Sequence, residues 1–222
     1  MPLPRLILIV TVAAGLIAGA ARAASSQADV RHTDPPPSAL APAIVSALAP
    51  GGLRLQVSSV QLDFWYVKAL SLKPGTSSPA WAGVPEGALL GAVRLHGNFR
   101  DVRGRVIKPG VYTMRFGIQP ENGDHLGVSP FREFVLLSPA TADTDLAPPG
   151  HQGTIDLSKQ TAGGSHPTVW SIDPPSTTAP LASTHVNDLE LTSYTMEVPV
   201  SRDGAAGGAL RFGLVLIGKI EA

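Results

Sequence analysis

The chain has 222 residues, and its 17 basic and 17 acidic side chains leave no net charge. It contains no cysteine, which excludes disulfides, thiolate zinc sites and iron–sulfur clusters. The balanced charge offers no general attraction to polyanions, so we predict no nucleic-acid partner. The 23 glycines and 21 prolines, together with only 5% aromatic residues, are typical of short strands joined by many turns.

Residues 1–23 have the pattern of a secretory signal peptide. Arg5 gives a positive start, residues 6–19 are uncharged and mostly apolar, and Ala21-Arg22-Ala23 fits the small-x-small cleavage rule. The apolar run has about 14 residues, fewer than the roughly 20 that span a bilayer. We therefore predict cleavage after Ala23 and export to the periplasm or the extracellular space, with no stable membrane span afterwards. An uncleaved membrane anchor is the alternative.

Residues 24–51 are predicted to be a largely disordered linker rich in proline and alanine. Residues 34–38, Asp-Pro-Pro-Pro-Ser, favour an extended polyproline conformation. Residues 43–49 have room for one or two helical turns, but a helix that short is marginal on its own. The folded part, residues 52–222, is then expected to be a single domain.

Alternation of apolar and polar residues predicts a series of strands. In chain order they cover residues 53–57, 60–66, 89–95, 99–106, 111–118, 131–137, 168–172, 189–198 and 209–220. Residues 138–167 and 173–187 are expected to be long irregular connections. The last strand is apolar on both faces near its end, which indicates a central strand covered on both sides.

The strand from residue 111 to 118 is predicted to be the one on which the other strands pack. Pro109-Gly110 favours a type II turn, in which the glycine takes a positive φ. The turn delivers a strand whose inward face carries Tyr112, Met114, Phe116 and Ile118. Thr113 and Arg115 are expected to point outward, toward solvent.

These elements predict the fold class. Many strands, turn signals between them and almost no helical periodicity favour an all-β protein, an antiparallel β-sandwich of immunoglobulin-like type with long loops.

Two resemblances accompany this prediction. The run Ile107-x-Pro109-Gly110-x-Tyr112 resembles the tyrosine corner of immunoglobulin and fibronectin-III sandwiches, with a spacing one residue tighter. That resemblance implies a hydrogen bond from the Tyr112 hydroxyl to backbone a few residues upstream. Separately, the stretch from residues 64–70 through residues 127–134 resembles a family of uncharacterised secreted bacterial β-rich proteins. That resemblance implies an exported, β-rich protein and supplies no catalytic residues to carry over.

Metal ligands are the first candidate site. Asp124 and His125 lie in the connection 119–130, and His151 and His166 lie in the later connection. Three imidazoles and a carboxylate that converge can bind a metal. Their spacing matches no recognised ligand motif, and the neighbouring residues are ordinary turn formers. We therefore predict no metal and no cofactor.

Basic and aromatic side chains are the other candidates. Six cations lie between residues 94 and 115, namely Arg94, Arg100, Arg103, Arg105, Lys108 and Arg115, and only Asp101 opposes them. They can form an anion-binding face, or a charged strand edge that prevents aggregation, which we favour. Trp65, Trp81 and Trp170 can form a stacking platform for sugar or pack in the core.

No catalytic signature accompanies these residues: the sequence has no nucleophile elbow, P-loop or dinucleotide fingerprint. We therefore predict an exported, non-enzymatic module that acts in binding or as an accessory or structural protein. Its partner would be a cell-envelope polysaccharide or another exported protein. The alternative is a metal-dependent or carbohydrate-active enzyme that uses loops 119–130 and 139–167.

Overall fold

The structure is a computed structural model that describes residues 27–32, 34–76, 80–119, 131–164, 166–173 and 181–220. The predicted signal peptide, residues 1–23, lies outside the described residues, as does all of the connection 119–130 except Gln119. Neither of the two described α-helices is long and apolar enough to cross a membrane.

The described elements are mostly strands. They are β1 (Gln27–His32), β2 (Gly52–Val57), β3 (Val60–Tyr66), β4 (Leu70–Ser71), β5 (Leu89–Leu95), β6 (Phe99–Arg100), β7 (Val106–Ile107), β8 (Gly110–Ile118), β9 (Glu133–Pro139), β10 (Thr168–Asp173), β11 (Ser183–Val186), β12 (Thr192–Arg202) and β13 (Ala205–Ile217). The helices are α1 (Pro42–Ala47), the short 3-10 helix η1 (Trp81–Gly83) and α2 (Gly150–Ala162). The described part of the chain is therefore mostly β, with few helices, which confirms the β-rich part of the predicted fold class.

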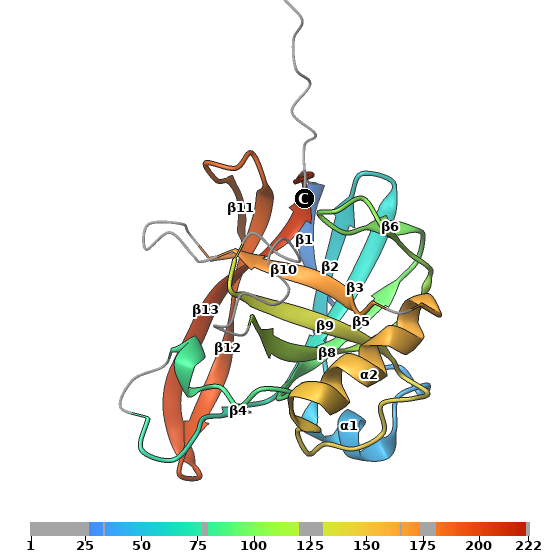
Figure 1. The fold of residues 1–222 in the computed structure, drawn as a ribbon. Helices are drawn as coiled ribbons and strands as arrows, with labels where there is room; N and C mark the ends of the chain where they lie inside the picture. Colours follow the sequence, from blue (N-terminus) through green and yellow to red (C-terminus); the bar gives the residue numbers. More distant parts are fainter. Residues whose placement is uncertain are drawn as a thin grey trace, which may run out of the picture.

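Within the described residues, the strands form one large sheet and one small hairpin. The large sheet has 11 strands in the order β1-β2-β3-β5-β8-β9-β10-β13-β12-β11, with β4 attached to β12. Its pairs are antiparallel except for the parallel pair of β4 and β12. Figure 1 shows β8, β9 and β10 connecting the early strands to β12 and β13. Side chains from both ends of the sheet, such as Phe64 and Phe212, belong to one buried cluster, so the sheet curves around a shared core.

The predicted strands are largely confirmed, including the last one. β13 lies between β10 and β12, and Val215 on its second face is only 2% exposed. The region 99–106 is a hairpin instead of one strand, because Gly104 at φ 77° allows the chain to reverse between β6 and β7.

The hydrogen bond that the tyrosine-corner resemblance implies is present, but the turn before it differs from the prediction. The Tyr112 hydroxyl donates a hydrogen bond to the Lys108 carbonyl oxygen at 2.8 Å. Gly110 is the first residue of β8 and is not among the glycines with positive φ, so the predicted type II geometry is wrong. A Cβ at Gly110 would lie 3.0 Å from the Tyr112 hydroxyl oxygen. A side chain at this position would therefore crowd the tyrosine ring, which folds back over Gly110.

Strand β8 is buried on both faces, which corrects the expected direction of two side chains. Tyr112, Met114 and Phe116 are buried as predicted, and Ile118 is half-buried. Thr113 and Arg115, expected to face solvent, are both 0% exposed. These two side chains are buried because the segment after β9 covers this face of the strand. Its Asp143, 1% exposed, accepts hydrogen bonds from Arg115 Nε at 2.6 Å and Nη2 at 2.7 Å.

Helix α2 was not predicted, because residues 138–167 were expected to be irregular. Its buried residues are Thr154 and Ser158, so the helix lacks the apolar stripe by which helices are recognised. The Ser158 hydroxyl donates to the Leu137 carbonyl at 2.8 Å and accepts the Thr168 N–H at 3.0 Å. In Figure 1, α2 lies against β9 and covers the outer side of the sheet. The helix ends at Gly163, whose left-handed φ of 60° suits a helix C-terminus.

The predicted disordered linker is also corrected where it is described. β1 pairs with β2, and Leu40, Ile44 and Leu48 are buried in the core at 4%, 0% and 2% exposure. Their spacing of four residues places them on one side of a segment that includes α1. The short helix is stable because tertiary packing, rather than intrinsic propensity, holds it. A short strand, β11, likewise lies in the second stretch expected to be irregular.

Candidate functional site

The two described candidate histidines lie far apart. His151 lies in the first turn of α2, and His166 follows the helix end. From His151 to the helix end at Ala162 the axis rises about 17 Å, at 1.5 Å per residue, and His166 follows four residues after that end. His151 Nδ1 instead contacts Glu86 Oε1 at 2.6 Å. Asp124 and His125 lie outside the described residues, and within the described part no cluster of three metal-ligating side chains occurs.

Two candidate tryptophans for sugar stacking are used in packing. Trp65 is 1% exposed; the His32 ring meets it edge-on at 5.0 Å, and the Arg94 guanidinium lies 5.9 Å from its ring centre. Trp81 stacks on Phe116 with ring centres 5.1 Å apart. Trp65 therefore follows the packing alternative, and one face of the half-buried Trp81 ring is covered by Phe116.

The third tryptophan is buried as well. Trp170 is 1% exposed, its ring lies 4.7 Å from that of Phe99, and its indole N–H donates to the Val215 carbonyl at 2.5 Å. It therefore stabilises the junction of β10 with β13.

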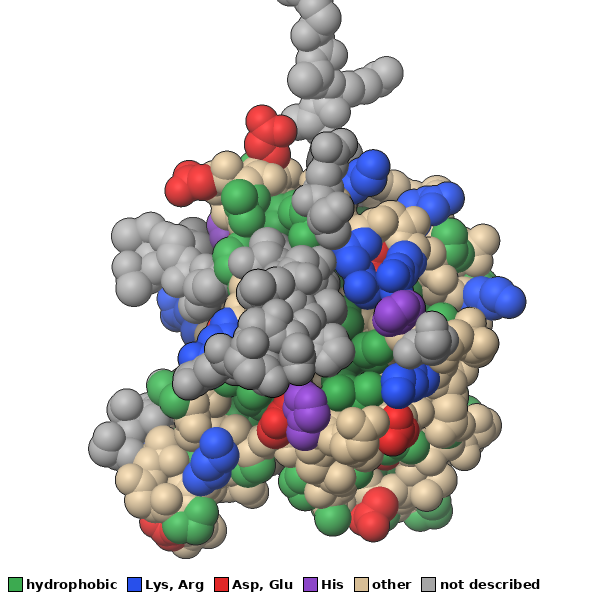
Figure 2. Space-filling model, in the orientation of Figure 1, with side chains coloured by type: hydrophobic (Ala, Val, Ile, Leu, Met, Phe, Trp, Pro, Cys, Tyr) green, Lys and Arg blue, Asp and Glu red, His purple; other side chains and the backbone are tan. Residues whose placement is uncertain are grey.

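The candidate arginines do come together, on the β6–β7 hairpin. Figure 2 shows Lys and Arg side chains gathered over this part of the molecule. Asp101, 4% exposed, accepts the backbone N–H groups of Arg103 at 3.0 Å and Arg105 at 2.8 Å. Arg100 donates to the Gly104 carbonyl at 2.8 Å, and burial lowers the pKa of Arg103. These contacts close the hairpin on itself, and the buried Arg115 is not part of this face.

A polar cluster that the sequence did not reveal lies on β10, β11 and β12. The carboxylate of Asp173, 3% exposed, accepts Ser193 Oγ–H at 2.6 Å and lies 3.1 Å from His185 Nε2. Gly213 has no side chain to separate Asp173 from Ser193. In a nucleophilic triad the imidazole stands between the hydroxyl and the carboxylate. Here the carboxylate stands in the middle, so His185 does not activate Ser193, and the cluster satisfies a buried aspartate.

A second carboxylate, Asp63 on β3, organises the outer side of the early strands. It is 1% exposed and accepts Arg54 Nε at 2.6 Å, while His96 Nε2 lies 2.8 Å away. Burial alone would raise the pKa of Asp63, but the hydrogen bonds from Arg54 and His96 outweigh it and lower the pKa.

This shift predicts how stability depends on pH. A carboxyl group whose pKa is lowered by folding stabilises the protein above its ordinary pKa, here 3.8, and loses that contribution as the pH falls through the lower folded value. We expect Asp63→Asn to be destabilised at pH 7, and the difference from the unmodified chain to shrink steadily below about pH 4. Urea unfolding at a series of pH values measures this. Asp188→Asn, at an exposed site, is the control, and a difference that stays constant with pH would contradict the expectation.

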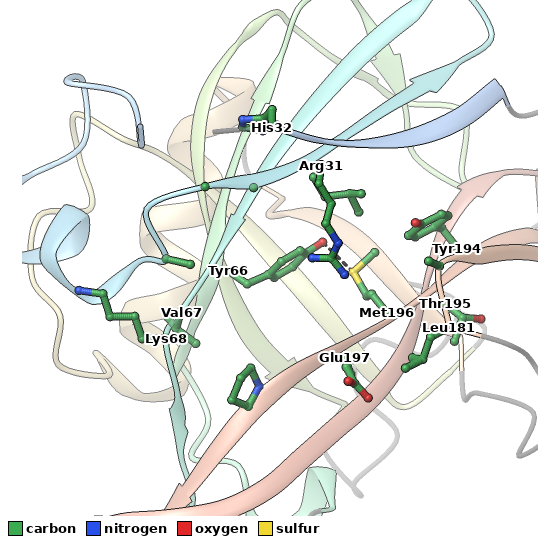
Figure 3. A pocket seen from close by; sticks show the side chains of 16 residues that line it. Arg31, His32, Tyr66, Val67, Lys68, Leu181, Tyr194, Thr195, Met196 and Glu197 are labelled. Carbon is green, nitrogen blue, oxygen red and sulfur yellow. Dashed lines mark hydrogen bonds between the residues drawn. The ribbon is translucent and has the colours of Figure 1, made fainter. Parts of the chain in front are cut away.

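An open groove lies between the two ends of the large sheet. It is a cavity of about 490 Å³ lined by β1, β2 and the end of β3 on one wall and by β12 and the residues before β11 on the other. Leu53, Tyr66, Tyr194 and Met196 supply its apolar surface. Figure 3 shows Tyr66 and Met196 facing each other across it, and the Tyr66 hydroxyl donates to the Met196 sulfur at 2.6 Å. Burial raises the pKa of Tyr66 well above its usual value, so the phenol stays neutral.

Charged groups stand at the rim of this groove. Arg31 on β1 and Glu197 on β12 are exposed and line opposite walls. Figure 3 shows Arg31 reaching toward Tyr66 and Met196. Within the described part of the chain, neither Arg31 nor Glu197 forms an ion pair with another side chain. Lys68, by contrast, donates to the Ser46 carbonyl at 2.7 Å.

Sequence reasoning missed the groove for two reasons. Arg31 was assigned to a disordered linker, and Glu197 follows an ordinary alternation in a strand. Arg31 and Glu197 line the same groove only because the sheet curves until its two ends face each other. No protein-family model, curated protein or solved structure matches this chain.

Proposed function

We propose that the chain is an exported, non-enzymatic binding module built as a β-sandwich, and that its ligand occupies the groove. The signal-peptide pattern of residues 1–23 supports export. Two ends of one sheet that enclose a common core support the sandwich description. The wide separation of His151 and His166 gives the metal-dependent alternative no support.

The groove itself carries this proposal. Ligand sites are concave and mostly apolar, have volumes of roughly 300–1,000 Å³, and contain a few polar groups that orient the ligand. The groove has a volume of about 490 Å³, within this range, and combines an apolar lining with a few polar groups. Arg31 has no competing partner in the described residues, so it is available to an anionic group of a ligand.

An anionic fluorescent dye tests the proposal without knowledge of the natural ligand. Anilinonaphthalene sulfonate combines apolar rings with a sulfonate, so we expect it to bind the groove with its sulfonate near Arg31. Arg31→Gln should raise the dissociation constant by about tenfold or more, since a charge-assisted hydrogen bond contributes roughly 1.5–3 kcal/mol. Fluorescence titration of the folded protein measures this.

The matched control is Arg105→Gln, another exposed arginine, which lies on the β6–β7 hairpin away from the groove. It should leave the dissociation constant unchanged. No saturable dye binding, or equal losses in the two variants, would refute the groove as the binding site. Export is checked separately, because N-terminal sequencing of the secreted protein should begin at Ala24; a mature chain that retains Leu6 would refute it.

A further inference from the structure

The edge of β12 that borders the groove is only partly covered. β11 pairs with residues 192–195 of β12, and β4 pairs with Val200 and Ser201. Between these two short strands, and among the residues that the structure describes, residues 196–199 have a strand partner only in β13, on one side. Three of the four residues, Met196, Glu197 and Pro199, line the groove, so the gap in the edge and the groove coincide.

The direction of the backbone groups in this gap follows from the neighbouring hydrogen bonds. The Thr195 carbonyl accepts the Ala182 N–H at 2.9 Å, on the side of β12 that faces β11. Alternate residues of an antiparallel strand point their N–H and C=O groups to the same side. The register with β13 is continuous from Thr195 to Pro199, so the Glu197 N–H, the Glu197 carbonyl and the Pro199 carbonyl point into the gap.

Pro199 is consistent with this assignment. Proline has no N–H to donate, and within sheets it occurs at positions whose N–H would face an unpaired edge. The Ser201 carbonyl, two residues further on, accepts the Leu72 N–H at 3.0 Å, so β4 resumes pairing on the same side. The gap therefore presents one backbone donor and two acceptors, which is the pattern that an added strand satisfies.

We propose that the groove takes an extended segment of another polypeptide, which pairs with the open edge of β12 and presents an acidic side chain to Arg31. The gap of residues 196–199 spans about 13 Å, so the added strand is short. Its apolar side chains pack on Leu53 and Tyr66, and its carboxylate completes the ion pair that Arg31 lacks in the described residues. This inference rests on the proposed function, because it names the class of ligand for the same groove.

A polypeptide fits the groove better than a sugar does. Carbohydrate sites usually offer an exposed aromatic face, and Trp65 and Trp81 are both engaged in packing. The backbone groups of Glu197 and Pro199 that point into the gap have the spacing of a strand and no strand partner among the described residues. Backbone pairing sets the affinity in such complexes, and pockets for alternate side chains set the specificity.

The test uses a fixed panel of acetylated and amidated pentapeptides of valine and threonine, with aspartate, asparagine or lysine at each position in turn. Calorimetric titration should give the tightest binding for an aspartate peptide, and Arg31→Gln should remove its advantage over the asparagine peptide. N-methylation of that peptide should abolish binding at amides that face β12 and leave it nearly unchanged at the alternate amides. Uniform effects of N-methylation would overturn the proposal.

Two variants at one residue separate backbone from side-chain recognition. Glu197→Pro removes the backbone N–H that points into the gap without breaking a bond to β13, whereas Glu197→Ala keeps that N–H. We expect the first to weaken peptide binding at least tenfold and the second to weaken it less than threefold, with thermal melting confirming that both fold. Equal binding by the two variants would overturn the proposal. If the dye binds and no peptide of the panel does, only this inference fails; if the dye does not bind, the proposed function fails.

Discussion

Replacement of Arg115 by alanine should lower the free energy of unfolding by about 3–5 kcal/mol, the range found when one partner of a buried ion pair is removed. Arg115 is 0% exposed and donates to Asp143 through Nε at 2.6 Å and to the Gly87 carbonyl through Nη1 at 2.7 Å. Without the guanidinium, Asp143 remains buried and unpaired, and the Gly87 carbonyl loses a donor. Urea unfolding at neutral pH measures the loss.

A double variant separates the ion pair from the space it fills. Arg115→Met combined with Asp143→Leu removes both charges and retains apolar volume, so it should be considerably more stable than Arg115→Ala. If both variants lose the same stability, side-chain volume rather than the unpaired carboxylate is responsible.

The hydroxyl of Thr113 also donates to Asp143, at 2.5 Å. Thr113→Ala should therefore cost about 1–3 kcal/mol, the range for a buried group left without its hydrogen bond, instead of the small loss expected of a surface position.

Replacement of Phe116 by alanine should cost about 3–5 kcal/mol, as for other buried aromatic residues. Phe116 is 1% exposed, and its ring stacks on Trp81 at 5.1 Å. Trp81 in turn meets Phe212 of β13 at 5.5 Å. The substitution therefore opens a cavity between the middle of the sheet and its last strands, where few neighbours can move in to fill it.

The control for Phe116 is Val106→Ala on β7, where the side chain is 43% exposed. It should change the free energy of unfolding by less than about 0.5 kcal/mol. Similar losses at the two sites would contradict the assignment of Phe116 to the core. Phe116 and Arg115 are adjacent on β8 and face opposite sides. A chain that carries both Phe116→Ala and Arg115→Ala therefore tests whether the two faces are coupled, because its loss of stability can be compared with the sum of the two single losses.

Local patterns determined much of this fold. Alternation predicted β2, β3, β5 and β8, because the side chains on the face of a strand that enters the core recur at every second position. The Tyr112 hydrogen bond to Lys108 spans only four residues, so the sequence around the corner contains both partners. The apolar residues on both faces of β13 likewise predicted its central place in the sheet.

Tertiary structure decided the features that depend on residues far apart in the chain. Arg115 looks like a solvent-facing cation in its own strand, and it is buried because Asp143, 28 residues later, neutralises it. Helix α2 buries Thr154 and Ser158, whose hydroxyls donate to backbone carbonyl groups. Because its buried residues are polar, the sequence lacks the apolar periodicity from which a helix is predicted. The groove needs the curvature of the whole sheet to bring Arg31 opposite Glu197. Burial of polar groups depends on partners, and those partners are brought near only by the completed fold.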